Sequence, residues 1–189
     1  AETTQKGPLT ATYLSGAIAL ADTVMLETEL HAAKVLPPHL EHTQVEDEAT
    51  VRLMRQVGRL MRPDALVIVE STIGPGFLRN RLLPAVNEEL QQRGVLEAGQ
   101  NANLAHAFQR LEPGPRWYRS LLDQERVGAG VTAEANRKLE DYLRTVGFRY
   151  RLFSRVEAVE FMKTLENAWR FGLMELMIGY IRAAEIVGV

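Results

Sequence analysis

The sequence contains no cysteine, and this absence excludes several kinds of chemistry. Disulfide bonds, thiolate metal sites and a thiol nucleophile cannot form within these 189 residues. Long hydrophobic runs are also missing, because no apolar stretch approaches the roughly 18 residues that span a bilayer. Residues 1–6 lack the apolar segment of a signal peptide. We therefore expect a protein of the reducing cytoplasm without a membrane partner.

A strong excess of either charge is absent as well. The 22 basic and 24 acidic residues give a formal net charge of -2, which provides no basic footprint for nucleic acid or an anionic membrane. The hydrophobic content of 46% is that of an ordinary globular protein. The length is sufficient for one buried core with an appendage, so we expect one main domain.

Two ligand-binding patterns are missing or weak. No G-x-G-x-x-G loop follows a predicted strand, and Gly128-Ala129-Gly130, the nearest imitation, lies too late in the order of elements. Three histidines, His31, His39 and His42, lie in one polar segment. Their spacing is a marginal metal-ligand pattern and no cysteine accompanies them, so we predict no metal site.

Apolar patterns predict alternating strands and helices over most of the chain. Strands are predicted at 9–13, 23–26, 65–69, 126–130 and 148–153, and helices at 14–21, from 48, at 78–90 and at 133–146. Thr132 and Gly147 are the predicted caps of the helix 133–146. Segments 31–47 and 99–114 are predicted to be irregular. Strands alternating with helices indicate an α/β fold with a parallel sheet.

A long run of helical spacing closes the sequence. Apolar residues recur from Arg155 to Val187, and Ser154 is the predicted N-cap. Because the run is longer than ordinary globular helices, we expect a break near Gly172 or Gly179. Its apolar residues lie on more than one face, which predicts an interface. We therefore divide the chain into residues 1–153 and 154–189.

The segment Val67–Gly76 is the most informative part of the sequence. A run of apolar residues ends at Glu70-Ser71-Thr72, and the chain then turns through Gly74-Pro75-Gly76 into an amphipathic run. This pattern is typical of a buried strand with a polar carboxyl end, where ligands bind in open α/β sheets. The alternative is that the three polar residues only end the strand and cap the next helix.

A second candidate group lies in the long helical run. Lys163 and Asn167 are four residues apart and share one face of the helix. An ammonium and an amide that project together could stabilise an alkoxide or a tetrahedral oxyanion. The alternative is a solvated helix face without a ligand.

These segments resemble the UDP-glucose/GDP-mannose (nucleotide-sugar) dehydrogenase family. Residues 70–76 resemble its Glu-Ser-Thr-x-x-Pro-Gly signature, and residues 160–170 resemble its Ala-Glu-x-x-Lys-x-x-Glu-Asn-x-x-Arg signature. Residues 106–114 are similar to its Ser-Pro-Glu-Arg-Val-x-Pro-Gly segment, with Gln109 at the glutamate position. The family's Pro-Thr-Pro strand ending reads Glu27-Thr28-Glu29 here, so only the threonine is kept.

The resemblance implies a partial Rossmann-like parallel sheet, the later half of the NAD-binding domain, followed by the long α-helix of the central domain. It implies an NAD-dependent nucleotide-sugar 6-dehydrogenase, which oxidises a primary alcohol to a carboxylate, and a homodimer through the long helix. By this resemblance Lys163, Asn167, Thr28 and Gln109 are the candidate catalytic residues. Glu70, Ser71 and Thr72 are the candidate cofactor contacts. A glutamine cannot exchange a proton near neutral pH, so the role of the family's glutamate does not transfer to Gln109.

Two alternatives remain open. The chain lacks the family's glycine loop and nucleophilic cysteine, so we expect a fragment, a chain with missing segments, or a degenerate relative. Gln109 and the lost prolines favour a non-catalytic Rossmann-like binding or assembly module. A 6-phosphogluconate dehydrogenase-like enzyme would carry Lys-x-x-Asn, and the spacing of Lys163 and Asn167 does not match that pattern.

Overall fold

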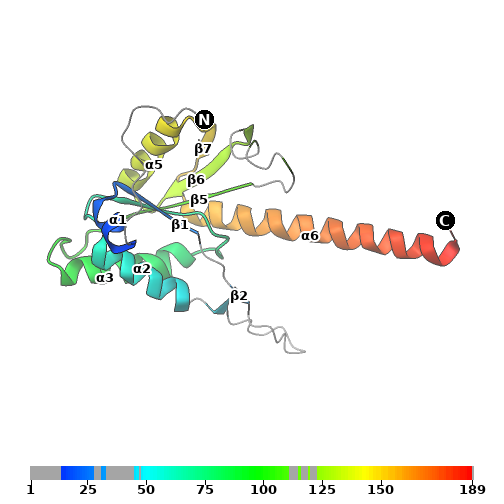
Figure 1. Cartoon of the computed structure of the whole chain (residues 1–189), viewed down its shortest axis with the longest axis horizontal. Helices are drawn as coiled ribbons and strands as arrows, with labels where there is room; N and C mark the ends of the chain where they lie inside the picture. Colours follow the sequence, from blue (N-terminus) through cyan, green and yellow to red (C-terminus); the bar gives the residue numbers. More distant parts are fainter. Residues whose placement is uncertain are drawn as a thin grey trace.

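The computed structural model describes residues 14–27, 31–32, 45–46, 48–110, 115, 119 and 123–188. A central sheet carries helices on both faces, and one long helix projects away from it (Figure 1). The strand predicted at residues 9–13 lies outside the described residues. Within the described part of the chain, no helix is long and apolar enough to cross a membrane.

The main sheet has five strands in the order β1-β4-β5-β6-β7. They are β1 (Thr23–Leu26), β4 (Leu66–Val69), β5 (Asn103–Phe108), β6 (Arg126–Gly130) and β7 (Tyr150–Leu152). The pairs β1·β4, β4·β5 and β6·β7 are parallel, which confirms the predicted α/β class with a Rossmann-like sheet. The pair β5·β6 is antiparallel, so β6 begins at the edge where β4 and β5 end.

Two segments predicted to be irregular contain strands. Strand β5 lies at the centre of the sheet, and its residues 104–108 are buried. The prediction was wrong because His106 interrupts the apolar run and the alanines on either side are small. In the segment 31–47, β2 (His31–Ala32) pairs antiparallel with β3 (Val45–Glu46). That ladder is only two residues long on each side, too short to give a pattern.

Helices cover the two faces of the sheet and bury β4 on both sides. Helices α2 (Glu48–Leu60) and α3 (Leu83–Gln92), the latter preceded by η1 (Leu78–Leu82), pack on the face that carries Val67 and Val69. Helix α5 (Ala133–Val146) packs on the face that carries Leu66 and Ile68. Burial on both faces explains why β4 is apolar throughout rather than alternating. A short helix, α1 (Leu14–Leu20), precedes β1.

The predicted caps of α5 are confirmed, and the glycines before it have a packing role. The Thr132 hydroxyl accepts a hydrogen bond of 3.1 Å from the Ala135 amide, and Gly147 ends the helix at φ 86°. At Gly130 a β-carbon would lie 2.3 Å from the Asn136 amide nitrogen. The glycine therefore lets α5 approach the end of β6, which accounts for the Gly-Ala-Gly sequence without a bound phosphate.

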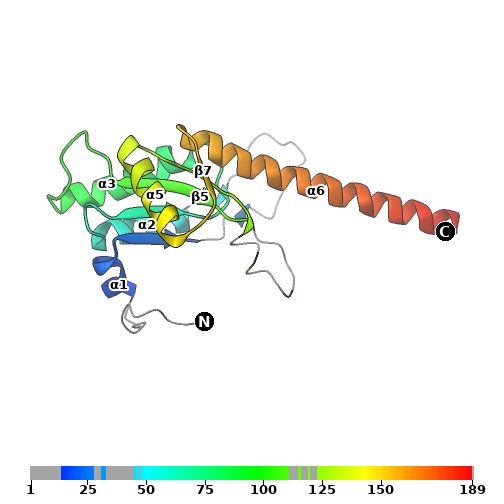
Figure 2. The same cartoon turned by 90° about the horizontal axis from the view of Figure 1, so that it is seen from above.

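The long helix α6 (Val156–Val187) is continuous, so the predicted break near Gly172 or Gly179 is wrong. An isolated glycine costs a helix only about 1 kcal/mol, and a β-carbon at either position would meet no packed neighbour within 4 Å among the described residues. The N-cap is Arg155, without a side-chain hydrogen bond, rather than the predicted Ser154. Figure 2 shows α6 leaving the sheet and extending away from it.

Candidate functional site at the carboxyl ends of the strands

Polar residues from several elements gather at one edge of the sheet. Glu70 follows β4 and Gln109 follows β5. Arg126, the first residue of β6, lies at the same edge because β6 runs antiparallel to β5. Strands β1 and β4 end side by side, with Leu26 opposite Val69 and the Glu70 amide donating to the Leu26 carbonyl at 2.9 Å. Thr28, a candidate catalytic residue by the family resemblance, lies outside the described residues.

The Glu70 carboxylate joins the ends of three strands. Its Oε1 pairs with Nη1 of Arg126 at 2.9 Å, and its Oε2 accepts a hydrogen bond from the Gln109 side-chain amide. The Arg126 guanidinium lies 4.5 Å from the centre of the Phe148 ring. Burial raises the pKa of the Glu70 carboxyl, and the charge of Arg126 opposes that shift. The group therefore fixes the strand ends relative to one another.

An amide at position 109 suits this arrangement. A carboxylate here would face Glu70, and two adjacent carboxylates disfavour ionisation of both. The Gln109 amide instead donates to Glu70, while its backbone carbonyl accepts a hydrogen bond from Lys163. Gln109 thus links the Glu70 carboxylate at the end of β4 to Lys163 on helix α6.

Lys163 lies over the end of β5. Its Nζ is 3.1 Å from the Gln109 carbonyl oxygen and 5.2 Å from the centre of the Phe108 ring. Burial lowers the pKa of the Lys163 amine; Glu166 opposes that shift, and Arg170 and Arg110 reinforce it. The ammonium is therefore held in a half-buried position by a neutral acceptor and an aromatic ring.

Asn167 contacts the end of β4. Its Nδ2 donates to the Thr72 hydroxyl at 3.3 Å, and Thr72 itself is exposed. Ser71 is buried beside it. The structure therefore brings the candidate residues Lys163 and Asn167 of α6 to the strand ends that carry Glu70, Thr72 and Gln109.

Sequence reasoning missed Glu160, although it lies in the signature that contains Lys163. Its side chain is fully buried and accepts hydrogen bonds from the backbone amides of Gly76 at 2.6 Å and Leu78 at 2.9 Å. Burial raises the pKa of the Glu160 carboxyl despite both hydrogen bonds, which act in the opposite direction. Glu160 attaches the turn that follows Glu70-Ser71-Thr72 to α6. The glutamate of the Ala-Glu pair was the available signal.

Sequence reasoning also gave His106 no role. The ring is fully buried, with Nδ1 2.8 Å from the Val69 carbonyl oxygen and Nε2 without a hydrogen-bond partner among the described residues. A carbonyl oxygen only accepts, so Nδ1 carries the proton. Burial, reinforced by the charge of Lys163, lowers the pKa of His106 to about 4. The ring is therefore neutral at pH 7.

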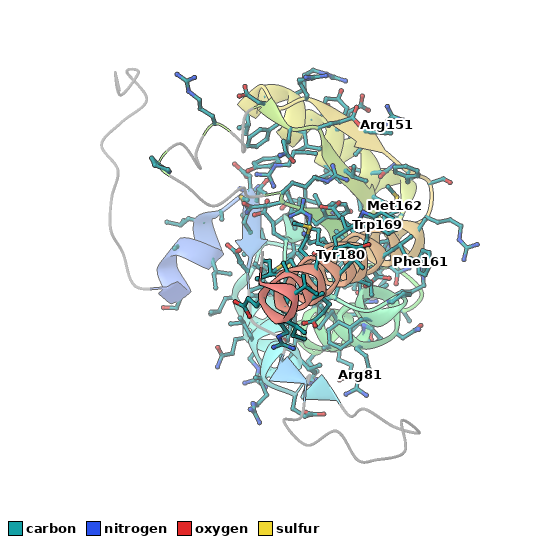
Figure 3. The ribbon with its side chains drawn as sticks, turned by 90° about the vertical axis from the view of Figure 1, so that its right-hand side faces the viewer. Arg81, Arg151, Phe161, Met162, Trp169 and Tyr180 are labelled. Atoms are coloured by element: carbon teal, nitrogen blue, oxygen red, sulfur yellow. The ribbon has the colours of Figure 1, made fainter. Side chains whose placement is uncertain are left out.

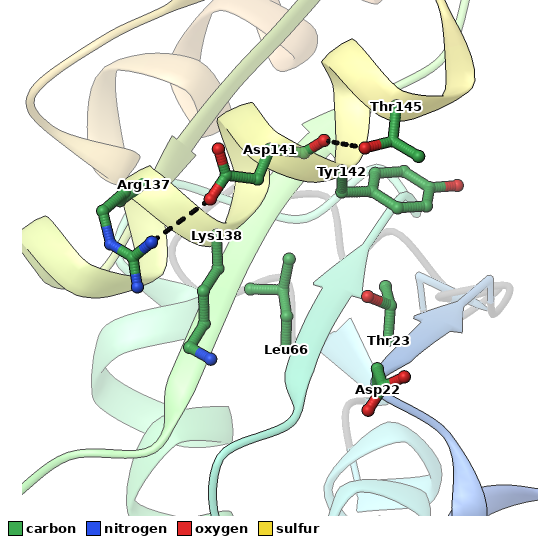
Figure 4. Close-up of a pocket in the computed structure, with 8 residues that line it drawn as sticks. All are labelled: Asp22, Thr23, Leu66, Arg137, Lys138, Asp141, Tyr142 and Thr145. Carbon is green, nitrogen blue, oxygen red and sulfur yellow. Dashed lines mark hydrogen bonds and ion pairs between the residues drawn. The ribbon is translucent and has the colours of Figure 1, made fainter.

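A hollow lies at the opposite edge of the sheet, near the amino ends of β1 and β4. It encloses about 430 Å³ and is lined by Asp22, Thr23, Leu66, Arg137, Lys138, Asp141, Tyr142 and Thr145 (Figure 4). Arg137 there pairs with Glu134 and Asp141 of its own helix. Across the residues that the structure describes, no group of three His, Cys, Asp or Glu could hold a metal. His39 and His42 lie outside those residues.

Comparisons with known proteins point to one group of enzymes. No family model matches the sequence. A UDP-N-acetyl-D-mannosamine dehydrogenase of Pyrococcus horikoshii is 32% identical over 120 residues, which cover 63% of this chain and 27% of that protein. The solved NDP-N-acetyl-D-galactosaminuronic acid dehydrogenase of Methanosarcina mazei Go1 aligns with a TM-score of 0.66 and 27% identity, over 82% of this chain and 31% of that one.

The solved UDP-D-ManNAc dehydrogenase of Pyrococcus horikoshii gives a similar result, with a TM-score of 0.66 and 25% identity over 84% of this chain and 35% of that one. The chain thus spans about a third or less of the length of these relatives. Sequence and fold agree with the motifs at residues 70–76 and 160–170. The predicted resemblance is confirmed: over the residues that it spans, this chain is similar to the nucleotide-sugar dehydrogenase family.

Proposed function

We propose that this chain is part of an NAD-dependent nucleotide-sugar 6-dehydrogenase that oxidises a primary alcohol to a carboxylate in the cytoplasm. One observation carries the proposal: the Lys163 ammonium contacts the end of β5, and the Asn167 amide contacts the end of β4. Ligands of open α/β sheets bind beyond these strand ends. The two donors therefore lie where the alcohol of a substrate would be held.

The chemistry of alcohol oxidation suits this pair of donors. Negative charge develops on the substrate oxygen, and fixed donors in a half-buried site stabilise it. An ammonium has three donor hydrogens, and Lys163 uses one of them on the Gln109 carbonyl. In this proposal Lys163 and Asn167 hold the oxyanion, Thr28 holds a water, and Gln109 positions Lys163 rather than moving a proton.

The residues at the strand ends fit part of an NAD cofactor. When bound, NAD would accept the hydride that leaves the alcohol carbon. Thr72 is exposed at the edge and Ser71 is next to it, whereas both oxygens of Glu70 are already bonded within the protein. Of the three proposed cofactor residues, Thr72 would thus contact the cofactor directly, and Glu70 would keep the strand ends in position. The chain has no G-x-G-x-x-G loop for a pyrophosphate.

The proposed assembly is a homodimer through α6. Large apolar side chains from Phe171 to Val187 are exposed, and Figure 3 looks along the helix from its carboxyl end, with Phe161, Trp169 and Tyr180 labelled. Contiguous exposed apolar surface of this kind marks a protein interface. A two-fold axis would let the same surface cover itself in both protomers.

Turnover of the natural protein that contains this chain tests the function. With NAD and a panel of UDP- and GDP-sugars, we expect NADH absorbance to rise. We expect Lys163→Ala to lower kcat by about 10²-fold, the scale for losing one oxyanion donor. The control is Lys138→Ala on α5, which removes the same charge far from the strand ends and should leave kcat unchanged. Equal turnover in wild type and Lys163→Ala would refute the assignment.

Gln109 favours a second candidate, a non-catalytic binding or assembly module. The residue at the position of the family's glutamate is an amide, and it is bonded to Glu70. Such a module would bind a nucleotide sugar in calorimetry yet produce no NADH. NADH production by the wild-type protein rules this candidate out.

A further inference from the structure

Three cationic side chains surround a single carboxylate beside the strand ends. Nε of Arg110 lies 2.8 Å from Oε2 of Glu166, and Nη2 of Arg170 lies 2.8 Å from Oε1 of the same group. Lys163 is on the same helix face, three residues before Glu166. It forms no ion pair with a carboxylate of the described residues, and its hydrogen bond goes to the neutral Gln109 carbonyl. Three positive charges therefore face one negative charge.

Among the described residues, the other groups bonded to these side chains do not add a second carboxylate. Arg110 also donates from Nη1 to the backbone carbonyl of Glu125 at 3.0 Å, and that carbonyl carries no net charge. The Glu125 carboxylate pairs with Arg151 instead. The neighbouring Arg126 and Glu70 form a neutral pair of their own. Counted over the ion pairs of the described residues, these three cations thus share one carboxylate, in a chain whose net charge is -2.

Contacts with an aromatic ring and a carboxylate hold Arg110 and Lys163 in place before any ligand arrives, whereas Arg170 is exposed beside them. The Phe108 ring lies 4.9 Å from the Arg110 guanidinium carbon and 5.2 Å from the Lys163 amine. The side chains of Arg110 and Glu166 are only 24% and 20% exposed, so their interactions are weakly screened by solvent. Each guanidinium presents donors in a planar fork that matches carboxylate and phosphate oxygens.

We propose that Arg110, Lys163 and Arg170 bind an anionic oxygen group of the ligand, either a carboxylate or a phosphate. In the free protein the Glu166 carboxylate occupies the position between the two guanidinium groups where that anion would bind. The identity of the ligand rests on the proposed function. Two parts of such a ligand share this chemistry, the phosphates of the nucleotide and the carboxylate of the oxidised sugar. The anion-binding step itself needs neither cofactor nor turnover.

Calorimetric titration at low ionic strength tests the site directly. Inorganic pyrophosphate and D-glucuronate are each titrated into the 189-residue chain. We expect binding of at least one, weakened tenfold or more in Arg170→Gln. Glu166→Gln should strengthen binding several-fold, because the internal competitor is lost. The matched control is Arg137→Gln, which removes the same charge from an ion-paired arginine on α5 and should bind like wild type.

The outcomes separate the sources of the anion and can overturn the proposal. Binding of pyrophosphate alone assigns the site to the nucleotide phosphates, and binding of glucuronate alone assigns it to the sugar acid. Each variant is checked for folding by circular dichroism, and Lys163→Gln replaces Arg170→Gln if the latter does not fold. The proposal fails if wild type binds neither probe, if Arg137→Gln loses as much affinity as Arg170→Gln, or if Glu166→Gln weakens binding. Anion binding by this chain, together with no NADH production by the natural protein that contains it, would support this site and count against the dehydrogenase.

Discussion

The two parts of helix α6 are built from similar residues and have opposite surroundings. From Val156 to Asn167 the helix packs on the sheet, with Val156, Val159 and Glu160 buried and hydrogen bonds to the ends of β4 and β5. From Phe171 to Val187 its large apolar side chains are 38–85% exposed. We call these the proximal and the distal part of α6.

The difference shows which part of the helix is stabilised by contacts within this chain. The proximal part is held by burial and by specific acceptors, so its position follows from the fold. A helix in water gains little stability without a packed apolar face, and the distal part finds no such face in the described residues. The apolar face of the distal part therefore needs a covering surface from outside the described residues, which we propose to be a second copy of the chain.

The largest effect is expected from removing the acceptor that attaches the proximal part. Glu160→Ala leaves the half-buried amide of Gly76 and the buried amide of Leu78 without this acceptor, at about 1–3 kcal/mol each, so we expect the free energy of unfolding to fall by about 4 kcal/mol. Glu175→Ala, in the distal part, is the matched control and should unfold like wild type. Urea denaturation measures both. Similar stability in the two variants would remove the distinction between the two parts.

His106, which lies under the proximal part, should make stability depend on pH. The native pKa is about 4 and that of the unfolded chain about 6.5. The unfolded chain therefore binds more protons between these values, and stability falls as the pH is lowered from 6.5 to 4. This shift corresponds to roughly 3 kcal/mol. His106→Leu should lose less stability than wild type between pH 7 and 4.5 in urea titrations.

The carboxyl groups of Glu70 and Glu160 do not affect the comparison of pH dependence between wild type and His106→Leu. Their raised pKa values act in the opposite direction, because stability from such groups is present at low pH and is lost as the pH rises. Both groups are common to wild type and variant, so their contributions cancel in the comparison. An identical pH dependence in the two proteins would show that His106 titrates normally.

A smaller effect is expected in the distal part. Ile181→Gln removes one apolar side chain from each protomer of the proposed interface. The dissociation constant of the dimer should therefore rise at least tenfold, which corresponds to about 1.4 kcal/mol of binding free energy. The adjacent Arg182→Gln changes a polar position of the same helix and should leave the dimer intact. Light scattering across a concentration series measures both. A wild-type chain that is monomeric at micromolar concentration rules out the dimer.

Much of the fold was predictable because strong local patterns agree with it. The apolar run of β4 ends in charged and hydroxyl residues, and Thr132 and Gly147 cap α5 where a helix pattern begins and ends. Strand β5 was missed because its central residue is a histidine, and only the packed structure buries it. The continuity of α6 could not be decided from Gly172 and Gly179, since an isolated glycine weakens a helix without ending it.

Some residues at the strand ends could be named from the sequence, but their contacts could not. The spacing of Lys163 and Asn167 gives a shared face, but their partners, the Gln109 carbonyl and the Thr72 hydroxyl, depend on how α6 crosses the sheet. Glu160 looks like a solvated helix residue in sequence, and its burial arises from the turn at Gly76. Tertiary placement of this kind leaves no local pattern.

The antiparallel pairing of β5 with β6 has a consequence for how this sheet can vary. Between parallel neighbours the chain must cross from one edge of the sheet to the other, so the connection is part of the architecture. The segment that joins Gln109 to Arg126 begins and ends at the same edge, beside Lys163. Its length and sequence can therefore change without moving a strand. A change in this segment would therefore act at the proposed ligand edge while the sheet and α6 keep their form.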